Sequence, residues 1–563
     1  MKRVFISVLV VLATVQMSFA KSDFELVRDT EILINMMRSL HGDYVDTLSS
    51  TQILRDATRG IARSLDPYTS YIDEKEMEQF EISTTGKYGG IGAIIRQNGE
   101  WVTIVQPYRG APADRAGLKI GDRIVEVDGE SAKGWTVSEV SEKLKGTPGT
   151  TLNLKIGSVL DTTKIRRVRF KRERISIPAV QYAGMISGTD SVAYLRHDDF
   201  TDGGYELMRD ELLRLRDEGM KSLILDYRGN GGGIMDEATK VLSLFVPQGS
   251  EVLKIKSRKD STSYKTVAKP LFPELPIVVL IGGSTASAAE IVSGALQDMD
   301  RAILVGGQSF GKGLVQSTIP VGYDAYLKLT TARYYIPSGR SIQAIDYSDH
   351  GEERVAGKVA DSLRREFKTA GGRRVLDGGG VAPDVEVEPQ YVSRFAATLY
   401  AMGIIEEWGA KYYRDNREQL EEQFKDEEVF KAWVEDFNVS SRDFLDFSAM
   451  VNGREGKIEY ESATSRAMKA LEKAAKDDRN SELEELLERL KEEEGLRDDL
   501  SSNLERYEAE IMQYMTSDVV MRFAYGEGVT LNSLRQDMEV QRAIELLTTD
   551  KAEYDELISG VEY

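Results

Sequence analysis

The sequence predicts a multidomain α+β protein with four parts: a helical N-terminal segment at 21–84, a β-rich module at 85–172, an α/β core at 173–390 and an α-helical domain at 391–563. Three observations predict this order. Apolar residues recur at helical spacing in the first and last parts. Short β-branched runs separated by glycine fill the second part. Unbroken apolar runs, each followed by glycine and a helical pattern, are typical of the third.

The N-terminus has the pattern of a secretory signal peptide over residues 1–20. Lys2 and Arg3 precede an apolar run, and the small residues Ser18 and Ala20 stand at positions −3 and −1 of the expected cleavage site. A buried first helix is the alternative, but polar and charged residues begin directly after this run. The run is shorter than the roughly 20 apolar residues that a membrane-spanning helix needs. We expect an exported protein of the periplasm or cell envelope, with no integral membrane segment in the mature chain.

The region at 391–563 is charged, almost free of proline and helical in pattern. An apolar stripe of Leu483, Leu487 and Leu490 runs through a glutamate-rich segment. Aromatic residues in its first half favour a folded helical domain over a disordered acidic tract. They are Phe430, Trp433, Phe437, Phe444 and Phe447. We expect helical packing or partner binding here, including an adaptor or self-association.

The composition excludes several classes of site. Without cysteine, the chain has no disulfide, thiol nucleophile, cysteine-ligated zinc or lipid-bearing cysteine. Only three histidines occur, at His41, His197 and His350, so a histidine-rich metal site is not expected. A net charge of −20 argues against nucleic acid as a partner, because phosphate contacts need clustered Lys and Arg. No metal or organic cofactor is implied.

The β module contains a glycine-rich segment, Tyr88-Gly89-Gly90-Ile91-Gly92, directly before a predicted strand. Successive backbone N–H groups there could form a nest for a carboxylate, since glycine lets the backbone approach a ligand. A short helix ending at glycine and a turn–strand–turn follow, at 111–118 and 121–129. The three segments resemble the PDZ domains of bacterial processing proteases, in which an extended C-terminal peptide adds as a strand. The alternative is a small β barrel whose glycines serve turns and bind nothing.

The core places a serine where a nucleophile could be activated. Ser287 lies between a buried strand that ends at Ile281 and a helix that carries Ile291. Free N–H groups and the positive end of the helix dipole could stabilise an oxyanion there. Lys312 follows between two glycines, and a lysine can act as general base if burial lowers its pKa. Taken singly, Ser287 could be a helix cap and Lys312 a surface lysine; the joint pattern favours catalysis.

The segments around Ser287 and at 309–316 resemble the C-terminal processing peptidases, the tail-specific protease family with Ser-Lys chemistry. The resemblance implies an α/β core of the crotonase/ClpP-like type. It also implies that Ser287 attacks the scissile carbonyl, that Lys312 takes its proton and passes it to the leaving amine, and that Gln316 orients Lys312. Ala289 stands where the family often has another serine. Four residues of regular strand would separate Lys312 and Gln316 by about 13 Å, so either the chain kinks at Gly313 or Gln316 lies outside the site.

The glycine-rich loop at 225–233 resembles the family loop that supplies the second oxyanion donor. We expect the donors to be the N–H groups of Gly233 and Ala288, and Gly232 is the alternative to Gly233. A dinucleotide-binding interpretation fails, because Ile234 stands where Gly-x-Gly-x-x-Gly needs its last glycine.

The resemblance covers about 25–390. Segments at 65–71 and 337–343 also resemble the family, on either side of the core. The family normally passes quickly from the second of these to a Pro-Asp-Val, which here begins at Pro383 after a charged insertion.

Together these patterns predict an exported serine endopeptidase that recognises substrate C-termini through a PDZ domain and cleaves by a Ser287–Lys312 dyad through an acyl-enzyme. The expected substrates are proteins or peptides with free, flexible, apolar C-termini, because an extended strand has to enter a narrow site. The alternative is a non-catalytic PDZ scaffold or adaptor of the cell envelope, with a decayed dyad. A third possibility, an acyl-CoA-handling enzyme of related topology, lacks an obvious place for the nucleotide.

Overall fold

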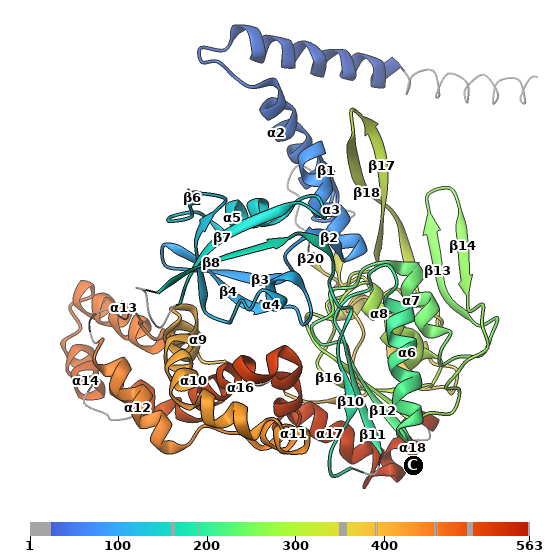
Figure 1. Cartoon of the computed structure of the whole chain (residues 1–563). Helices are drawn as coiled ribbons and strands as arrows, with labels where there is room; N and C mark the ends of the chain where they lie inside the picture. The colour runs from blue at the N-terminus through green and yellow to red at the C-terminus, as the bar shows by residue number, and fades with distance from the viewer. Residues whose placement is uncertain are drawn as a thin grey trace, which may run out of the picture.

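The computed structural model describes most of the chain. The described residues are 24–560, apart from 159–163, 190, 348–356, 389, 391, 455, 457, 459 and 492–498. The signal peptide predicted at 1–20 lies outside them. The predicted fold class is confirmed: a helical N-terminal segment, a β module, an α/β core and a helical C-terminal domain follow in order (Figure 1). Among the described residues, no helix is both long and apolar enough to cross a membrane.

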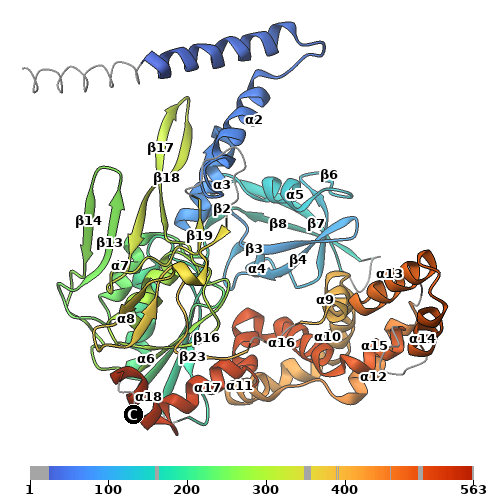
Figure 2. The ribbon, with the colours of Figure 1, turned by 180° about the vertical axis from the view of Figure 1, so that it is seen from behind.

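The N-terminal segment is helical and reaches away from the body. A helix over residues 24–43 projects outward, and α2 (Ser50–Arg63) leads back toward the core (Figure 2). The strand β1 (Ser70–Ile72) and the helix α3 (Glu74–Thr85) follow. β1 pairs antiparallel with β18 (Ala325–Tyr335), which fastens this segment to the core.

The β module is an antiparallel sheet with two short helices. Its elements are β2 (Lys87–Gly90), β3 (Ala93–Asn98), β4 (Trp101–Pro107), α4 (Pro112–Arg115), β5 (Asp122–Val127), β6 (Glu130–Ser131), α5 (Val137–Leu144), β7 (Thr151–Ser158), β8 (Ile165–Lys171) and β9 (Glu173–Ser176). The strand order β3-β4-β5-β7-β8 leaves β3 at an edge. Val102, Ile104 and Ile124 are fully buried in its core. β2 pairs with β9, and this ribbon links the module to the rest of the chain.

The α/β core is built on a six-stranded sheet. Its elements are β10 (Val180–Met185), β11 (Val192–His197), β12 (Ser222–Asp226), β15 (Ile277–Ile281), β16 (Ile303–Gly306) and β23 (Val385–Glu386), with α6 (Gly204–Asp217), α7 (Met235–Leu242) and α8 (Ala288–Asp298). The strands lie in the order given and are parallel, except that β10 runs antiparallel to β11. Every residue of β12 and β15 is buried, as their unbroken apolar runs predict.

Side chains of the central strands alternate between the two faces of the sheet, and helices cover each face. Leu223 and Leu225 pack in one cluster with α6, α7 and α8, whereas Ile224 points to the opposite face. That second face is covered by α17 (Met538–Leu547) and α18 (Lys551–Ser559), drawn in red at the bottom of Figure 1. These helices follow the part of the sequence that resembles the family, yet they complete the core.

A second sheet carries two hairpins that extend from the core. It joins β13 (Glu251–Ser257), β14 (Ser261–Lys265), β17 (Leu314–Gly322), β18 and β1. The strand order is β1-β18-β13-β14, with β17 paired to β18. The charged insertion forms short elements: β19 (Ile345–Asp346), β20 (Gly357–Lys358), η1 (Asp361–Leu363), β21 (Glu366–Lys368) and β22 (Arg374–Leu376).

The C-terminal domain is a folded helical assembly, as its aromatic residues predicted. Its helices before α17 are α9 (Arg394–Ala401), α10 (Ile404–Gln423), α11 (Glu427–Asp436), α12 (Ser441–Asn452), α13 (Ala463–Asp477), α14 (Ser481–Lys491), α15 (Leu500–Arg506) and α16 (Glu508–Ser533). Phe395, Phe447 and Met515 are fully buried at its centre. The rings of Trp433 and Phe437 pack with their centroids 4.6 Å apart and their planes inclined by 35°. Tyr525 breaks α16 with a φ of 56°, and its hydroxyl donates to Asp114 of the β module at 3.1 Å.

Candidate active site

Ser287 sits on a sharp turn between a buried strand and a helix. β15 ends at Ile281, and Ser287 is the residue before α8, with φ 56° and ψ −116°. A positive φ is uncommon outside glycine, so the surrounding structure has to hold it. Thr285 does so: its hydroxyl accepts from the Gly282 N–H at 2.9 Å and donates to the Tyr227 carbonyl at 2.8 Å. This geometry lifts Ser287 out of the turn as an exposed nucleophile would need.

Glu290 joins the serine turn to the lysine loop. Its carboxylate is 0% exposed, and Oε2 accepts the N–H groups of Ser287 at 2.9 Å and Lys312 at 2.8 Å. Oε1 accepts from the Ser309 hydroxyl at 2.5 Å and the Gly311 N–H at 2.7 Å. Burial raises the pKa of Glu290, and these hydrogen bonds oppose that rise. The sequence alone assigned Glu290 no role.

Lys312 is half-buried in the irregular loop before β17. Its Nζ lies 4.8 Å from the centre of the Tyr68 ring. Burial lowers the pKa of Lys312, the charge of Lys328 lowers it further, and Glu290 and Asp66 oppose this. Both causes favour the neutral amine that a general base requires.

Tyr68 reaches Lys312 because of a local turn in the segment at 65–71. Asp66 Oδ1 accepts the N–H groups of Tyr68 at 2.8 Å and Thr69 at 2.7 Å, which folds the chain back on itself. The sequence had matched this segment to the family without giving it a function.

One cavity of about 640 Å³ brings the predicted core residues together. Its wall includes Ser287, Lys312, Gln316, Gly232, Gly233 and Ala288. Residues of α3, including Phe80 and Thr84, line another side. Tyr334 also borders the cavity, and its hydroxyl donates to the carbonyls of Lys312 at 2.5 Å and Ser287 at 3.2 Å. The hydroxyl of Ser287 and the partly desolvated amine of Lys312 therefore border the same cavity.

The glycine loop packs directly against the serine turn. Gly232 has φ 106°, and a Cβ there would lie 2.7 Å from the Cβ of Ser287. The Gly232 N–H donates to Asn230 Oδ1 at 2.8 Å, while Asn230 Nδ2 donates to the His197 carbonyl at 2.8 Å. Asn230 is fully buried and was not singled out in the sequence. Because the Gly232 N–H is engaged, Gly233 and Ala288 are the better candidates for oxyanion donors.

Gln316 borders the cavity at an irregularity in β17. The pairing of β17 with β18 shifts register between Val315 and Gln316, and β17 begins only at Leu314. This departure from regular strand lets Lys312 and Gln316 line the same cavity. The Gln316 amide donates to the Thr330 hydroxyl at 3.2 Å, so its side chain is held by the neighbouring strand.

Proteins of known family resemble this chain over its core. A family profile described as "Peptidase family S41" matches residues 191–350, a "PDZ domain" profile matches 103–156, and "Probable PDZ-protease, C-terminal helical domain" matches 395–547. A carboxy-terminal-processing protease of Bartonella bacilliformis is 37% identical over 308 residues, which are 54% of this chain and 70% of that protein. The chain belongs to the carboxy-terminal-processing proteases of family S41.

Further relatives match this S41 peptidase over similar spans. A probable CtpA-like serine protease of Staphylococcus aureus (strain MRSA252) is 30% identical over 311 residues, which are 55% of this chain and 61% of that protein. The solved structure of a photosystem II D1 C-terminal processing protease aligns with 24% identity and a TM-score of 0.36, covering 64% of this chain and 93% of that one. The three profile matches and the relationship to the Bartonella protein make this chain a serine peptidase with a PDZ domain and a helical C-terminal domain.

The segment 88–92, predicted to bind a carboxylate in the PDZ domain, is packed against neighbouring parts of the chain. Gly89 lies against another loop, since a Cβ there would be 2.2 Å from the Gly146 carbonyl oxygen, and Gly90 packs on the Tyr88 ring. Burial raises the pKa of Tyr88, while hydrogen bonds from the backbone of Gly92 and Ala93 lower it. The Tyr88 hydroxyl therefore occupies part of the predicted nest. The neighbouring strand β3 is an edge strand beside α5.

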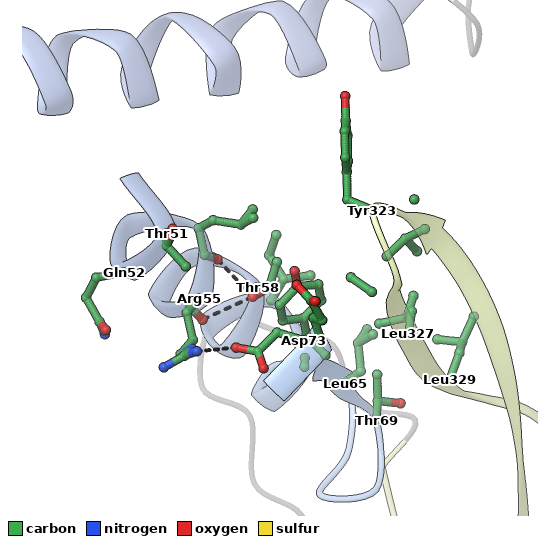
Figure 3. A pocket seen from close by; sticks show the side chains of 18 of the residues that line it. Thr51, Gln52, Arg55, Thr58, Leu65, Thr69, Asp73, Tyr323, Leu327 and Leu329 are labelled. Atoms are coloured by element: carbon green, nitrogen blue, oxygen red, sulfur yellow. Dashed lines mark hydrogen bonds and ion pairs between the residues drawn. The ribbon is translucent and has the colours of Figure 1, made fainter. Parts of the chain in front are cut away.

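A separate cavity of about 1000 Å³ lies between α2 and the β17–β18 hairpin (Figure 3). Arg55 and Asp73 form an ion pair at one side, and Leu327 and Leu329 project from β18 at the other. Its wall excludes Ser287 and Lys312, so it is distinct from the candidate active site. Within the described part of the chain, no cluster of three or more His, Asp or Glu could hold a metal ion.

Proposed function

We propose that this peptidase cleaves proteins near their C-termini through a Ser287–Lys312 dyad. The observation that carries the proposal is the shared cavity, in which Ser287 stands on a positive-φ turn and Lys312 has a lowered pKa. Glu290 anchors the backbones of both residues, which supports a constant spacing between them. Such a pair can replace Ser-His chemistry when the amine is neutral.

In the proposed reaction, neutral Lys312 accepts the Ser287 hydroxyl proton as Oγ attacks the scissile carbonyl carbon. The resulting oxyanion receives the N–H groups of Gly233 and Ala288. As the C–N bond breaks, Lys312 gives its proton to the leaving amine, which leaves an ester on Ser287. Water then attacks this acyl-enzyme, Lys312 takes the water proton and returns it to Ser287 Oγ, and the acid product departs.

The PDZ domain is proposed to capture the substrate C-terminus as an added strand. Among the described strands, β3 has one edge unpaired with another strand, and helix α5 contacts β3, which is the arrangement that strand addition needs. The partly buried apolar side chains of Ile95 on β3 and Val137 on α5 would suit apolar terminal residues. Substrates are therefore proteins with free, flexible, apolar C-termini. Export to the periplasm or cell envelope is proposed from the N-terminal signal pattern.

The decisive experiment is digestion of a protein with a flexible apolar tail, followed by mass spectrometry. Wild-type enzyme should shorten the tail, and a short pre-steady-state reaction should show an acyl adduct on the peptide that contains Ser287. Ser287→Ala and Lys312→Ala should lack both signals while binding the tail with unchanged affinity. Cleavage by Ser287→Ala would overturn the dyad, and binding without cleavage by wild type would favour the scaffold alternative.

A further inference from the structure

Arg228, at the start of the glycine loop, is bound by carboxylates from two distant parts of the chain. It follows β12 closely, and its Nη2 donates to Asp226 Oδ2 at 2.6 Å. Its Nη1 reaches the C-terminal helices, where it lies 2.8 Å from Asp537 Oδ2 and also donates to Glu539. The Arg228 side chain is only 24% exposed. One cation thus connects the catalytic core to the last part of the chain.

Because the groups around Arg228 are buried, each charge in this cluster is stable only with an opposite charge beside it. Asp226 is 5% exposed and accepts the Tyr194 hydroxyl at 2.6 Å. Burial opposes ionisation of Asp226, but Arg228 lowers the pKa of Asp226 overall. Burial likewise opposes the charge of Arg228, yet Asp226 and Asp537 raise its pKa overall. Removing one carboxylate would leave a half-buried guanidinium less well compensated.

The helix α17 holds its two carboxylates in place. Asp537 is its N-cap, and Oδ1 accepts the N–H groups of Glu539 and Val540, both at 3.1 Å. Val540 is fully buried against the face of the core sheet that carries Ile224, opposite α6, α7 and α8. A Cβ on Gly306 would lie 3.1 Å from Glu539 Oε1, so this end of α17 lies at the carboxyl ends of the parallel strands. Active-site loops of open α/β sheets begin at that edge.

The turn that carries Arg228 also organises the oxyanion loop and the serine turn. The Arg228 N–H donates to Asp226 Oδ1 at 2.9 Å. The carbonyl of Tyr227 accepts the Asn230 N–H at 3.0 Å and the Thr285 hydroxyl at 2.8 Å. Asn230 orients the glycines beside the nucleophile, and Thr285 holds the serine turn. A shift of Arg228 would therefore move both halves of the catalytic site.

We propose that Asp537 and Glu539 are positioning residues for the peptidase reaction. Through Arg228 they hold the loop that presents Gly233, so the helical C-terminal domain is part of the catalytic machinery. This inference rests on the proposed Ser287–Lys312 chemistry. It assigns a role to carboxylates that lie more than 200 residues beyond the nucleophile in the sequence.

The test uses full-length enzyme with Asp537→Asn, Glu539→Gln and the double substitution. Asn caps a helix as well as Asp, and Gln is isosteric with Glu, so the changes remove charge and largely preserve shape. Glu545→Gln is the matched control, because Glu545 is an exposed carboxylate of the same helix that pairs with Arg542 at 3.1 Å. Ser287→Ala is assayed in parallel on the same tailed peptide.

We expect kcat to fall about 3- to 10-fold in each single variant and about 10- to 100-fold in the double variant, part of what a whole oxyanion donor contributes. KM and the affinity for the tail should stay within about twofold, because α17 packs on the core sheet and α18. In an Arg228→Gln background, the double substitution should cause no further loss of kcat. The control should match wild type in every measurement.

The inference is overturned if the double variant keeps wild-type kcat, with or without a lower Tm, because the ion pairs would then only hold the helix in place. If the double variant does not fold, the isosteric Glu539→Gln variant decides by the same criteria. Activity in Ser287→Ala would instead overturn the proposed dyad. An inert Ser287→Ala with a fully active double variant would overturn this inference alone.

Discussion

The backbone N–H groups of Ser287 and Lys312 converge on a single oxygen, Oε2 of Glu290, at 2.9 and 2.8 Å. The proposed nucleophile and base come from separate loops, so their backbones are aligned by this shared acceptor. Glutamate suits the position because its two oxygens accept four hydrogen bonds in a site with no exposure.

Substituting this acceptor should disable the site with little change in shape. Glu290→Gln replaces one oxygen by an NH₂ group, which faces N–H donors and leaves them without an acceptor. We expect kcat to fall about 100-fold or more and the free energy of unfolding to fall by about 1–3 kcal/mol. Steady-state kinetics and denaturant unfolding measure the two effects. Glu206→Gln, an exposed change on α6, is the control; a fully active Glu290→Gln enzyme would refute the role of this carboxylate.

The lowered pKa of Lys312 predicts an alkaline rise in activity. Because the amine has to be neutral, kcat/KM should increase with pH, with a midpoint below the usual lysine value of 10.5. Lys312→Arg should be inactive at every pH, since its guanidinium stays protonated. A pH–rate profile that is flat, or whose midpoint lies above 10.5, would contradict the assignment.

The same shift predicts a stability effect of defined sign. The folded pKa of Lys312 lies below its unfolded value, so the unfolded state binds more protons between the two and stability rises with pH across that interval. Below the folded pKa, the half-buried ammonium destabilises the fold. Lys312→Met should therefore raise Tm at pH 7, and the difference from wild type should shrink as pH approaches 10.5. Calorimetry at both pH values tests this; a lower Tm for Lys312→Met at pH 7 would reverse the expected sign.

Lys328 borders the same cavity and should tune the proposed base, Lys312. Its charge lowers the pKa of Lys312, so Lys328→Gln should move the midpoint of the pH–rate profile to higher pH. Lys265→Gln, an exposed change on β14, should leave the midpoint in place. A downward shift, or equal shifts in the two variants, would show that Lys328 does not act through Lys312.

Tyr88 should limit the affinity of the PDZ domain for C-termini. Its hydroxyl engages the backbone N–H groups of Gly92 and Ala93, at the end of the segment 88–92 that we propose binds a terminal carboxylate. Tyr88→Phe frees these donors, so a tailed peptide should bind several-fold more tightly in calorimetric titration. The same peptide with an amidated C-terminus should show no gain. Equal gains for the acid and the amide would place the effect outside carboxylate recognition.

Short-range patterns predicted much of this molecule. The order of its four parts, the fully buried strands β12 and β15, and the folded helical domain all follow from periodicity within about 20 residues of sequence. The motif around Ser287 predicted a strand–turn–helix because its apolar runs and small residues are local signals.

Contacts between distant segments left weaker signals. Ser287 and Glu290 have the spacing of a capping box, which indicates a helix start but not that the same carboxylate reaches Lys312. The pairing of Arg228 with Asp537 depends on α17 packing under the core sheet, and amphipathic spacing alone does not say which surface a helix covers.

Two adjacent glycines provide a test of the proposed oxyanion loop. A Cβ on Gly232 would lie 2.7 Å from the Ser287 Cβ and 2.9 Å from the Ala286 carbonyl oxygen, at a φ of 106°. Gly232→Ala should therefore destabilise the fold by about 1–3 kcal/mol and displace the proposed nucleophile, Ser287, with loss of turnover. A Cβ on Gly231 would meet nothing within 4 Å, and its φ is not in the positive range.

Gly231→Ala should keep the free energy of unfolding within about 0.5 kcal/mol of wild type, as surface substitutions usually do. Denaturant unfolding and titration with an active-site acylating reagent measure stability and nucleophile placement separately. Equal behaviour of the two alanine variants would mean that the glycine loop can move away from Ser287, and the close packing that defines the proposed oxyanion hole would then not be required for turnover.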